Sequence, residues 1–381
     1  MDKSYLDSVF TRKLHEGNRL TWSMITRLVN EHDNVLESKD HYKRLYYKWL
    51  AKHTEKSIPG KTLDEKILEL KKEKVKLSDE RVQNNAYIRQ LSREETLKEI
   101  AHTVAEQIAV AKPLDLDSIE LHNSVRFADA GILEISDWHY GMDFQNYWNT
   151  YSPEIAKERI EKLYREVVDI CTHNEVYDLY VVNLSDLIAG RIHLGLRLES
   201  RFDVITQTME VSEILAEFLA KLAKKFNVHY YDCIDNHSRV EPNKSDAMNL
   251  ESFARFIPWF LQERLSRVRN ITIHENKFGE DIITFKVHGH SILGVHGDKD
   301  NVRNIIEKMS TFTEQHHDLI LTAHLHHFSA DENCNTLVVS NGSLMGTDTY
   351  AKNLRLNSKP QQNLIICSTK NPVKAIYRIT L

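Results

Sequence analysis

The chain has 381 residues, 41% of them hydrophobic and 28% charged, with a formal net charge of −5. This length predicts two or three folding units, and no apolar run approaches the ~18 residues needed to span a bilayer, which excludes a membrane-spanning protein. The N-terminus MDKSYLDSVF lacks the apolar core of a secretory signal and the four cysteines form no C-x-x-C pair, so we expect a cytoplasmic protein rather than a disulfide-stabilised one.

Residues 3–50 are predicted to form three short helices, because apolar side chains recur at helical spacing and Gly17, Thr21 and Ser38 supply one helix end and two caps. The third helix carries four cations with tyrosines interleaved, namely Lys39, Lys43, Arg44 and Lys48. This composition suits the recognition helix of a helix-turn-helix, whose cations contact phosphates and whose planar side chains contact bases. We therefore interpret residues 1–52 as a helix-turn-helix-like DNA-binding module. A helical docking module with a solvated basic face is the alternative.

Residues 53–112 are interpreted as a helical linker, because roughly residues 62–110 contain neither glycine nor proline. Six apolar residues in it fall on a heptad grid: Leu63, Ile67, Leu70, Leu77, Ile88 and Leu91. The polar stretch SDERVQNNA interrupts this grid. Three interpretations remain open: a long connecting helix, a coiled coil that dimerises the chain through residues 62–110, and a helix packed along the catalytic domain.

Charge is distributed unevenly between the two parts of the chain. Residues 1–112 carry 22 Lys+Arg and 18 Asp+Glu, a balance of +4, which leaves 50 − 22 = 28 and 55 − 18 = 37 for the remainder, a balance of −9. The asymmetry fits contact with a polyanion by the first part and metal binding by the second.

From Val125 onward, stretches typical of strands alternate with amphipathic helices. The predicted strands are 131–136, 178–185, 228–234, 283–287, 291–296, 319–323, 335–340, 363–368 and 375–381. The predicted helices are 153–173, 203–226, 247–267 and 301–316. We therefore expect residues 113–381 to form an α/β domain whose later, helix-poor strands build a second sheet.

Five of these strands are followed by side chains of the types that commonly bind metal ions. These side chains are Asp137, His139, Asp186, Asn236, His296, His324 and His326. The carboxyl ends of strands in an open α/β sheet form a crevice, so ligands from several strands can converge there. Carboxylate with imidazole favours Mn²⁺, with Fe²⁺, Zn²⁺ and the less well matched Mg²⁺ as alternatives. Taken singly, each residue has an ordinary structural explanation, such as a turn cap at Asp137 or a core histidine at His296.

In this order, the motifs Asp-x-His, Asp186, Asn-His, a lone His and His-x-His resemble those of the calcineurin-like metallophosphoesterase superfamily. The resemblance covers roughly residues 130–345 and implies a two-sheet αββα sandwich with two divalent metal ions. It implies that Asp137, His139, Asp186 and His326 hold one ion, and that Asp186, Asn236, His296 and His324 hold the other. It also implies that a water acidified between the two ions attacks the phosphorus atom. In that reaction His237 would bind a phosphate oxygen or protonate the leaving group.

The sequence departs from the family pattern near the bridging aspartate. Ser185 and Asp235 replace glycines, which predicts less tight turns, and Ser238 stands where an acidic residue often follows the histidine. Ala189 replaces a polar residue that usually orients that histidine. Candidate substitutes are Asp235, Arg191, His193 and Arg239.

The motifs SDLIAGR and DNHSR differ from those of protein phosphatases and are closer to DNA-repair exonucleases and phage-encoded members of the superfamily. The stretch NGSLMGTDTYA is expected to form a substrate-facing loop through Ser343, Thr347 and Tyr350, or else an ordinary surface loop. Our first hypothesis is a metal-dependent DNA nuclease in a bacterial cell or phage-infected host. The alternatives are a phosphodiesterase for small cyclic nucleotides and a DNA-binding regulator whose phosphoesterase domain is structural.

Overall fold

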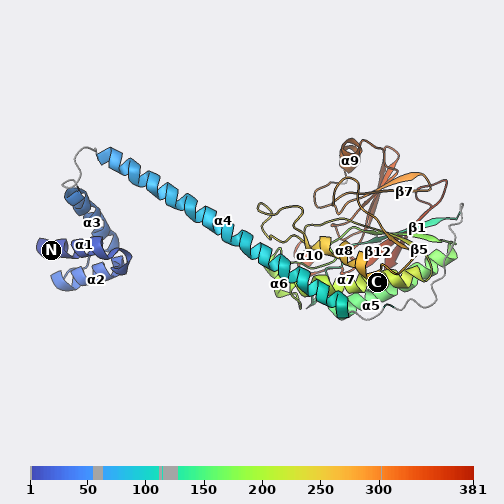
Figure 1. Cartoon of the computed structure of the whole chain (residues 1–381), viewed down its shortest axis with the longest axis horizontal. Helices are drawn as coiled ribbons and strands as arrows, with labels where there is room; N and C mark the ends of the chain where they lie inside the picture. The colour runs from blue at the N-terminus through green and yellow to red at the C-terminus, as the bar shows by residue number, and fades with distance from the viewer. Residues whose placement is uncertain (1, 55–62, 111–113, 115–127, 302) are drawn as a thin grey trace. The chain divides into compact units, whose positions relative to one another are not determined.

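The structure is a computed structural model that describes residues 2–54, 63–110, 114, 128–301 and 303–381 (Figure 1). It is mixed α/β and divides into two units, Met1–Glu95 and Thr96–Leu381. Residues 55–62 and 111–113, which adjoin the predicted domain boundaries, lie outside the described residues, so those boundaries remain predictions. Within the described ranges, no helix combines the length and the apolar character required to cross a bilayer.

The N-terminal unit begins with the three helices predicted from the sequence. They are α1 Lys3–Glu16, α2 Trp22–Asp33 and α3 Lys39–Thr54, with a short 3-10 turn, η1 Gly17–Arg19, after the first. The Asp2 carboxylate and the Thr21 hydroxyl accept backbone N–H bonds at the starts of α1 and α2, as expected of N-caps. Phe10, Ile25 and Tyr42 are fully buried between the helices. The module therefore has a core of its own, while its use as a helix-turn-helix remains a prediction.

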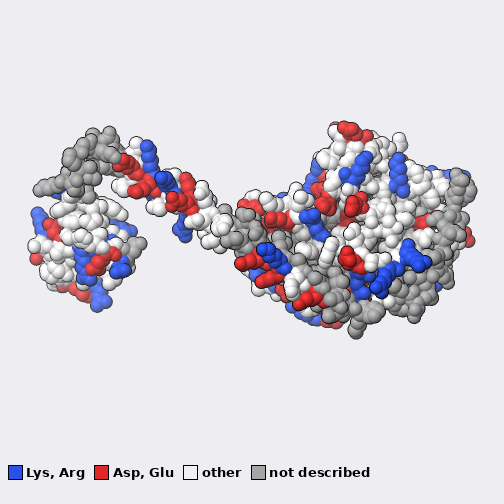
Figure 2. All heavy atoms as spheres, in the orientation of Figure 1, with Lys and Arg blue, Asp and Glu red and all other residues white. Residues whose placement is uncertain are grey.

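The tyrosines of α3 do not face solvent as a set. Tyr42 and Tyr46 belong to the core of the module, and only Tyr47 is exposed, with 61% of its surface accessible. The expectation that the tyrosines contact bases is therefore wrong for two of the three, because the helix uses that face to pack on α1 and α2. On the face in view in Figure 2, acidic and basic side chains of this unit are interspersed.

The helix predicted over roughly residues 62–110 is present as α4 Leu63–Val110, which has 48 residues, while its role as a linker remains a prediction. The division between the two units falls inside this helix. Its residues 67–85 are all exposed, including Ile67, Leu70 and Leu77 on the heptad grid.

The second unit contains two large sheets, and all nine strands predicted from the sequence are present. The six-stranded sheet has the order β13-β12-β1-β4-β5-β6, and the five-stranded sheet has the order β10-β11-β9-β8-β7. The strands of the first sheet are β1 Ala130–Ile135, β4 Asp178–Asn183, β5 Asn227–Asp232, β6 Ile271–Ile273, β12 Gln361–Cys367 and β13 Ala375–Thr380. Those of the second are β7 Ile283–Val287, β8 His290–Gly294, β9 Leu319–Thr322, β10 Ser329–Asn333 and β11 Thr336–Ser340. The strands β1, β4, β5 and β6 run parallel, as do β8, β9 and β11.

Successive side chains along each strand face opposite sides of the sheet. The core therefore forms three layers: one between helices and the first sheet, one between the two sheets, and one between the second sheet and α9. In β1, Leu133 packs with the helices α5, α7 and α8, whereas its neighbour Ile132 packs between the two sheets. In β8, Ile292 faces the other sheet and Leu293 packs against α9. The domain is therefore an α/β/β/α sandwich, as the family resemblance implied.

Helices and short strands differ from the predictions mainly at their ends. The helices are α5 Pro153–His173, α6 Leu194–Leu198, α7 Val204–Ala223, α8 Phe256–Arg264, α9 Ile305–Thr313 and α10 Thr349–Asn353, with the 3-10 turn η2 Phe253–Arg255 before α8. The predicted helices 247–267 and 301–316 are too long, because residues 247–251, 301, 303 and 304 form turns and loop. The sequence missed α6, α10, β6, β10 and the small pair β2 Phe144–Gln145 and β3 Thr150–Tyr151, all of five residues or fewer.

Candidate metal centre

The candidate ligands come from the carboxyl ends of two packed sheets. Asp137 and His139 follow β1, Asp186 follows β4 and Asn236 follows β5, all in the six-stranded sheet. His296 follows β8, and His324 and His326 follow β9, in the five-stranded sheet. The centre therefore lies where two sheet edges meet rather than in the crevice of one sheet.

Tight turns aim these side chains inward. Six non-glycine residues in the turns have left-handed backbone conformations: Asp137 (φ 52°), His139 (45°), Ser185 (72°), Asp186 (54°), His324 (67°) and His326 (58°). Each such residue costs about 1 kcal/mol or more, and strain of this kind concentrates at functional sites. The less tight turn expected at Ser185 is wrong, because serine adopts the left-handed conformation that glycine would take.

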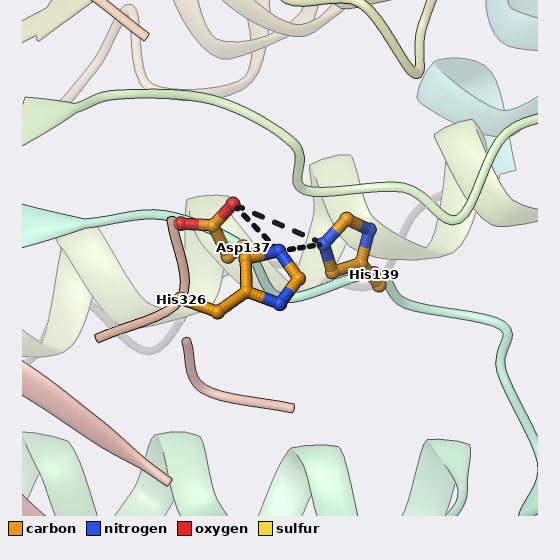
Figure 3. Close-up of side chains that lie close together, drawn as sticks. All are labelled: Asp137, His139 and His326. Carbon is orange, nitrogen blue, oxygen red and sulfur yellow. Dashed lines mark hydrogen bonds and ion pairs between the residues drawn. The ribbon is translucent and has the colours of Figure 1, made fainter. Parts of the chain in front are cut away.

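One group of ligands consists of Asp137, His139 and His326 (Figure 3). The Nε2 atoms of His139 and His326 lie 3.1 Å apart, and Asp137 Oδ1 is 3.3 Å from His326 Nε2 and 3.9 Å from His139 Nε2. Asp186 Oδ2 approaches His139 Nε2 to 4.0 Å. Two ligand atoms bound ~2.1 Å from one ion can be at most about 4.2 Å apart, so all four distances fit a shared ion.

The second group contains Asp186, His296 and His324. His296 Nε2 lies 3.1 Å from Asp186 Oδ2 and 3.1 Å from the side-chain oxygen of Asn236. The other nitrogen of His296, Nδ1, is 2.7 Å from the carbonyl oxygen of Leu184, which fixes the ring and leaves Nε2 for a ligand role. Asp186 Oδ2 therefore lies within ligand distance of side chains from both groups, His139 in the first and His296 in the second.

Unsatisfied buried atoms show that the residues fit metal ions. Asp137 Oδ1 and Asp186 Oδ2 are buried, and among the described residues neither has a hydrogen-bond partner, although His326 Nε2 lies 3.3 Å from the former and His296 Nε2 lies 3.1 Å from the latter. A buried carboxylate oxygen without a partner is costly. Divalent ions would satisfy both oxygens and would separate the two facing imidazole nitrogens of His139 and His326.

The charge states of the side chains agree with this fit. Burial raises the pKa of Asp186, but His237 and His296 outweigh burial and hold that pKa well below its usual value. Burial also lowers the pKa of His139 and of His324. Burial lowers the pKa of His296 and His326 as well, but the nearby carboxylates outweigh it: Asp186 raises the pKa of His296 to about 10, and Asp137 raises that of His326. The centre therefore offers ionised carboxylates together with neutral His139 and His324, whereas His296 and His326 must release a proton when an ion binds.

His237, the predicted catalytic histidine, points into the centre beside the first group. Its Nε2 is 3.8 Å from Asp186 Oδ2, and its Nδ1 is 2.8 Å from the backbone carbonyl oxygen of Ala189. The backbone of Ala189 thus does what a polar side chain was expected to do. The four residues named as substitutes for that polar side chain are therefore not needed to orient His237. Arg191 and Arg239 donate to the backbone carbonyls of Val240 and Pro242. Asp235 accepts from Ser185 and Ser238, and His193 precedes α6.

The predicted substrate-facing loop is wrong for two of its three residues. Ser343 and Thr347 are buried, and the Ser343 hydroxyl donates to the carbonyl oxygen of Asp137. They therefore brace the ligand turn instead of facing a substrate, and only Tyr350 is exposed. His327 is exposed, its Nδ1 contacts the Leu325 carbonyl oxygen, and it belongs to neither ligand group. The four candidate DNA-binding residues, Lys39, Lys43, Arg44 and Lys48, lie in the N-terminal unit.

Comparisons with known proteins give one relative across most of the chain and weak structural likenesses. No protein-family model matches. The SPbeta prophage-derived uncharacterized protein YonJ of Bacillus subtilis (strain 168) is 24% identical over 367 residues, covering 91% of this chain and 89% of that protein.

Three solved structures illustrate the structural likenesses. An archaeal phosphodiesterase is 13% identical, covers 66% of this chain and 99% of that chain, and has a TM-score of 0.34. Vps29 from Entamoeba histolytica complexed with Zn²⁺ is 10% identical, with coverage of 66% and 98% and a TM-score of 0.30. A predicted phosphoesterase from Streptococcus pneumoniae TIGR4 is 10% identical, with coverage of 67% and 99% and a TM-score of 0.28. TM-scores of this size assign neither fold nor activity, so the function is inferred from the centre itself.

Proposed function

We propose that this chain is a dinuclear-metal-dependent phosphoesterase that hydrolyses phosphodiester bonds, and that its substrate is DNA, bound in part by residues 1–52. The observation that carries the proposal is the convergence of ligands from five strands on both sides of Asp186. The family resemblance in the sequence supports the same class of reaction.

The residues of the centre would have different roles. Asp137, His139 and His326 would hold one ion, the side chains of Asn236, His296 and His324 would hold the other, and Asp186 would contact both. Bound divalent ions supply an acidified water and charge neutralisation for phosphoryl oxygens. With Nδ1 of His237 donating to the Ala189 carbonyl, Nε2 faces the centre, and the imidazolium form of the ring can donate its Nε2 proton to a phosphate oxygen or to the leaving group.

Support for DNA comes from the N-terminal unit. Lys39, Arg44 and Lys48 are exposed on α3, whereas Lys43 is half-buried and lies 3.6 Å from Asp40. Exposed lysine and arginine side chains on a helix favour contact with phosphates. The prophage origin of the relative favours a bacterial or phage-infected cytoplasm as the place of action.

A phosphodiesterase for small cyclic nucleotides is the second candidate, and the restricted opening of the centre favours it. Only 15% of the His237 side chain and 24% of the His326 side chain is exposed, and Asp137, His139 and Asp186 are buried. A small ligand enters such an opening more readily than a duplex.

Incubation with Mn²⁺ and a panel of single-stranded DNA, double-stranded DNA and cyclic nucleotides tests both candidates. We expect DNA cleavage that is lost in Asp186→Ala and His237→Ala and retained in His327→Ala, which removes an exposed imidazole next to the ligands. Turnover of cyclic nucleotides with intact DNA would replace the first candidate by the second. No turnover of any phosphodiester would overturn the enzymatic proposal and leave a DNA-binding regulator.

A further inference from the structure

Asp235 accepts four hydrogen bonds from the two turns that carry Asp186 and Asn236. Its Oδ2 accepts from Ser185 Oγ at 2.5 Å, from the Asp186 backbone N–H at 3.0 Å and from Ser238 Oγ at 2.9 Å. Its Oδ1 accepts from the Ser238 backbone N–H at 2.5 Å. Asp235 lies beside the Asn236 ligand, yet none of these contacts is to a ligand atom.

These bonds join the turn after β4 to the turn after β5. The link is reciprocal, because Asp235 accepts from the Asp186 N–H while Asp186 Oδ1 accepts from the His237 N–H at 3.3 Å. The backbone of Ser185 and Asp186 is left-handed, so this turn needs support from outside itself. Asp235 supplies that support from the neighbouring strand.

The three residues of this network are also three departures from the family pattern: Ser185, Asp235 and Ser238. Glycines at the first two positions would have no side chains with which to form it. We propose that Asp235 is a positioning residue that, with both serines, holds Asp186 and Asn236 in place for the second metal ion. This inference rests on the proposed metal-dependent function.

Titration of the metal-free full-length protein with Mn²⁺ in a calorimeter tests the role of Asp235 independently of turnover. In Asp235→Asn we expect the ion at Asp186, Asn236, His296 and His324 to bind about 10–100-fold more weakly, the usual effect of losing a residue that orients a ligand. The ion at Asp137, His139 and His326 should keep its affinity. Asp281→Asn is the matched control, because the Asp281 carboxylate is paired with Lys299 at 3.0 Å and is not part of the Asp235 network.

Two variants of Ser185 distinguish the effect of its side-chain hydrogen bond on metal affinity from the effect of its strained backbone. Ser185→Ala removes the hydroxyl and keeps the strained backbone, so it should weaken the second ion, whereas Ser185→Gly relieves the strain and should weaken it less. Equal affinity for both ions in wild type, Asp235→Asn and Ser185→Ala would overturn the positioning role while the proposed function stands. A wild-type protein that binds no Mn²⁺ would overturn the proposed function itself.

A second, independent observation concerns the exposed N-terminal half of α4. Ile67, Leu70, Leu77 and Ile88 lie at a and d positions of one heptad register, and between 42% and 65% of the surface of each is exposed. An isolated helix in water gains little from exposed leucine and isoleucine, since helices depend on packing of an apolar face. Packing against a partner would bury this stripe.

Charge complementarity identifies the partner as a second copy of the chain. Lys74 and Arg81 occupy the remaining a positions, and each directly follows a glutamate, Glu73 or Glu80, at a g position. In a parallel, in-register pair, each a side chain packs beside the g side chain of the other helix. We propose that residues 67–88 of two chains form a parallel coiled-coil dimer in which these four charges pair between chains.

Light scattering on the full chain tests this dimer. We expect a mass near twice 44.5 kDa for the wild type and a monomer for the variant Leu70→Glu with Leu77→Glu. The matched control is Val75→Glu with Val82→Glu, which changes two equally exposed apolar residues outside the a and d positions and should remain dimeric. A monomeric wild type at about 100 µM, or loss of the dimer only in the valine variant, would overturn the proposal.

Discussion

The Nδ1 atom of His237 lies 2.8 Å from the backbone carbonyl oxygen of Ala189. A carbonyl oxygen only accepts, so Nδ1 carries the proton and Nε2 faces Asp186 and the centre. The orientation of the histidine therefore depends on the path of the backbone through Ala189 and Gly190, not on a side chain at either position.

Gly190→Ala should strongly reduce turnover. A Cβ at Gly190 would lie 2.1 Å from the backbone carbonyl oxygen of His237, and its φ of 71° disfavours any side chain. The backbone that holds His237 would have to move, so we expect kcat to fall about 100-fold or more, as for loss of a general acid. In Gly195→Ala, where no described heavy atom lies within 4 Å of the added Cβ, activity should be unchanged. Wild-type turnover in Gly190→Ala would show that this orientation of His237 is not needed.

Metal ions should stabilise the folded chain. The buried Asp137 and Asp186 carboxylate oxygens lack hydrogen-bond partners among the described residues, so ions bind the folded state in preference to the unfolded one. At a free Mn²⁺ concentration of 100 times Kd, each ion adds about 2.7 kcal/mol to the free energy of unfolding. Thermal unfolding with and without chelator measures this. We expect Tm to rise with Mn²⁺ in the wild type and in His327→Ala, and to rise much less in Asp186→Ala. The same rise in all three would place the stabilising ions elsewhere.

The local part of the centre could be predicted from the sequence because each ligand directly follows a buried strand. Asp137 and His139, for example, need only the alternation of β1 and the parallel order of the sheet to be placed at the edge. Contacts between distant segments could not be predicted. The left-handed turn at Ser185 is supported by Asp235, 50 positions away, and buried Ser343 donates to Asp137 across 206 positions. The stretch around Ser343 has the composition of a surface loop, and only the packed structure shows that it is internal.

Tertiary packing also explains the misassigned faces of α3. Tyr42 and Tyr46 belong to its buried side, and an amphipathic tyrosine is equally consistent with a core or a binding face. The sequence therefore predicted the helix correctly and the role of these tyrosines incorrectly.

Glu134 in β1 should make stability depend on pH. Burial raises its pKa from 4.5 to about 8, against a smaller opposing effect of the hydrogen bond from Asn363. Its Oε2 accepts from Asn363 Nδ2 at 2.8 Å, while its Oε1 is buried without a partner in the described part of the chain. The folded state therefore binds a proton that the unfolded state releases, and stability falls as pH rises from about 4.5 to about 8.

The variant Glu134→Gln removes this titration and keeps the shape of the side chain. We expect its stability to match the wild type near pH 5 and to exceed it near pH 8 by up to a few kcal/mol, since each unit of pKa shift corresponds to about 1.4 kcal/mol. Urea unfolding at both pH values measures the difference. Glu161→Gln, at an exposed pair with Lys221, is the control and should show no such trend. A difference independent of pH would mean that Glu134 does not titrate in this range.

The exposed cations of α3 should set the salt dependence of DNA binding. If Lys39, Arg44 and Lys48 each contact one phosphate, each alanine variant should weaken binding for all sequences alike and reduce the slope of log K against log salt by about 1. Fluorescence anisotropy with the full chain between about 50 and 200 mM salt measures that slope. Lys3→Ala, an exposed lysine on α1, should leave it unchanged. Identical affinity and slope in the three α3 variants and the wild type would exclude this helix as the DNA contact and favour a docking role for residues 1–52.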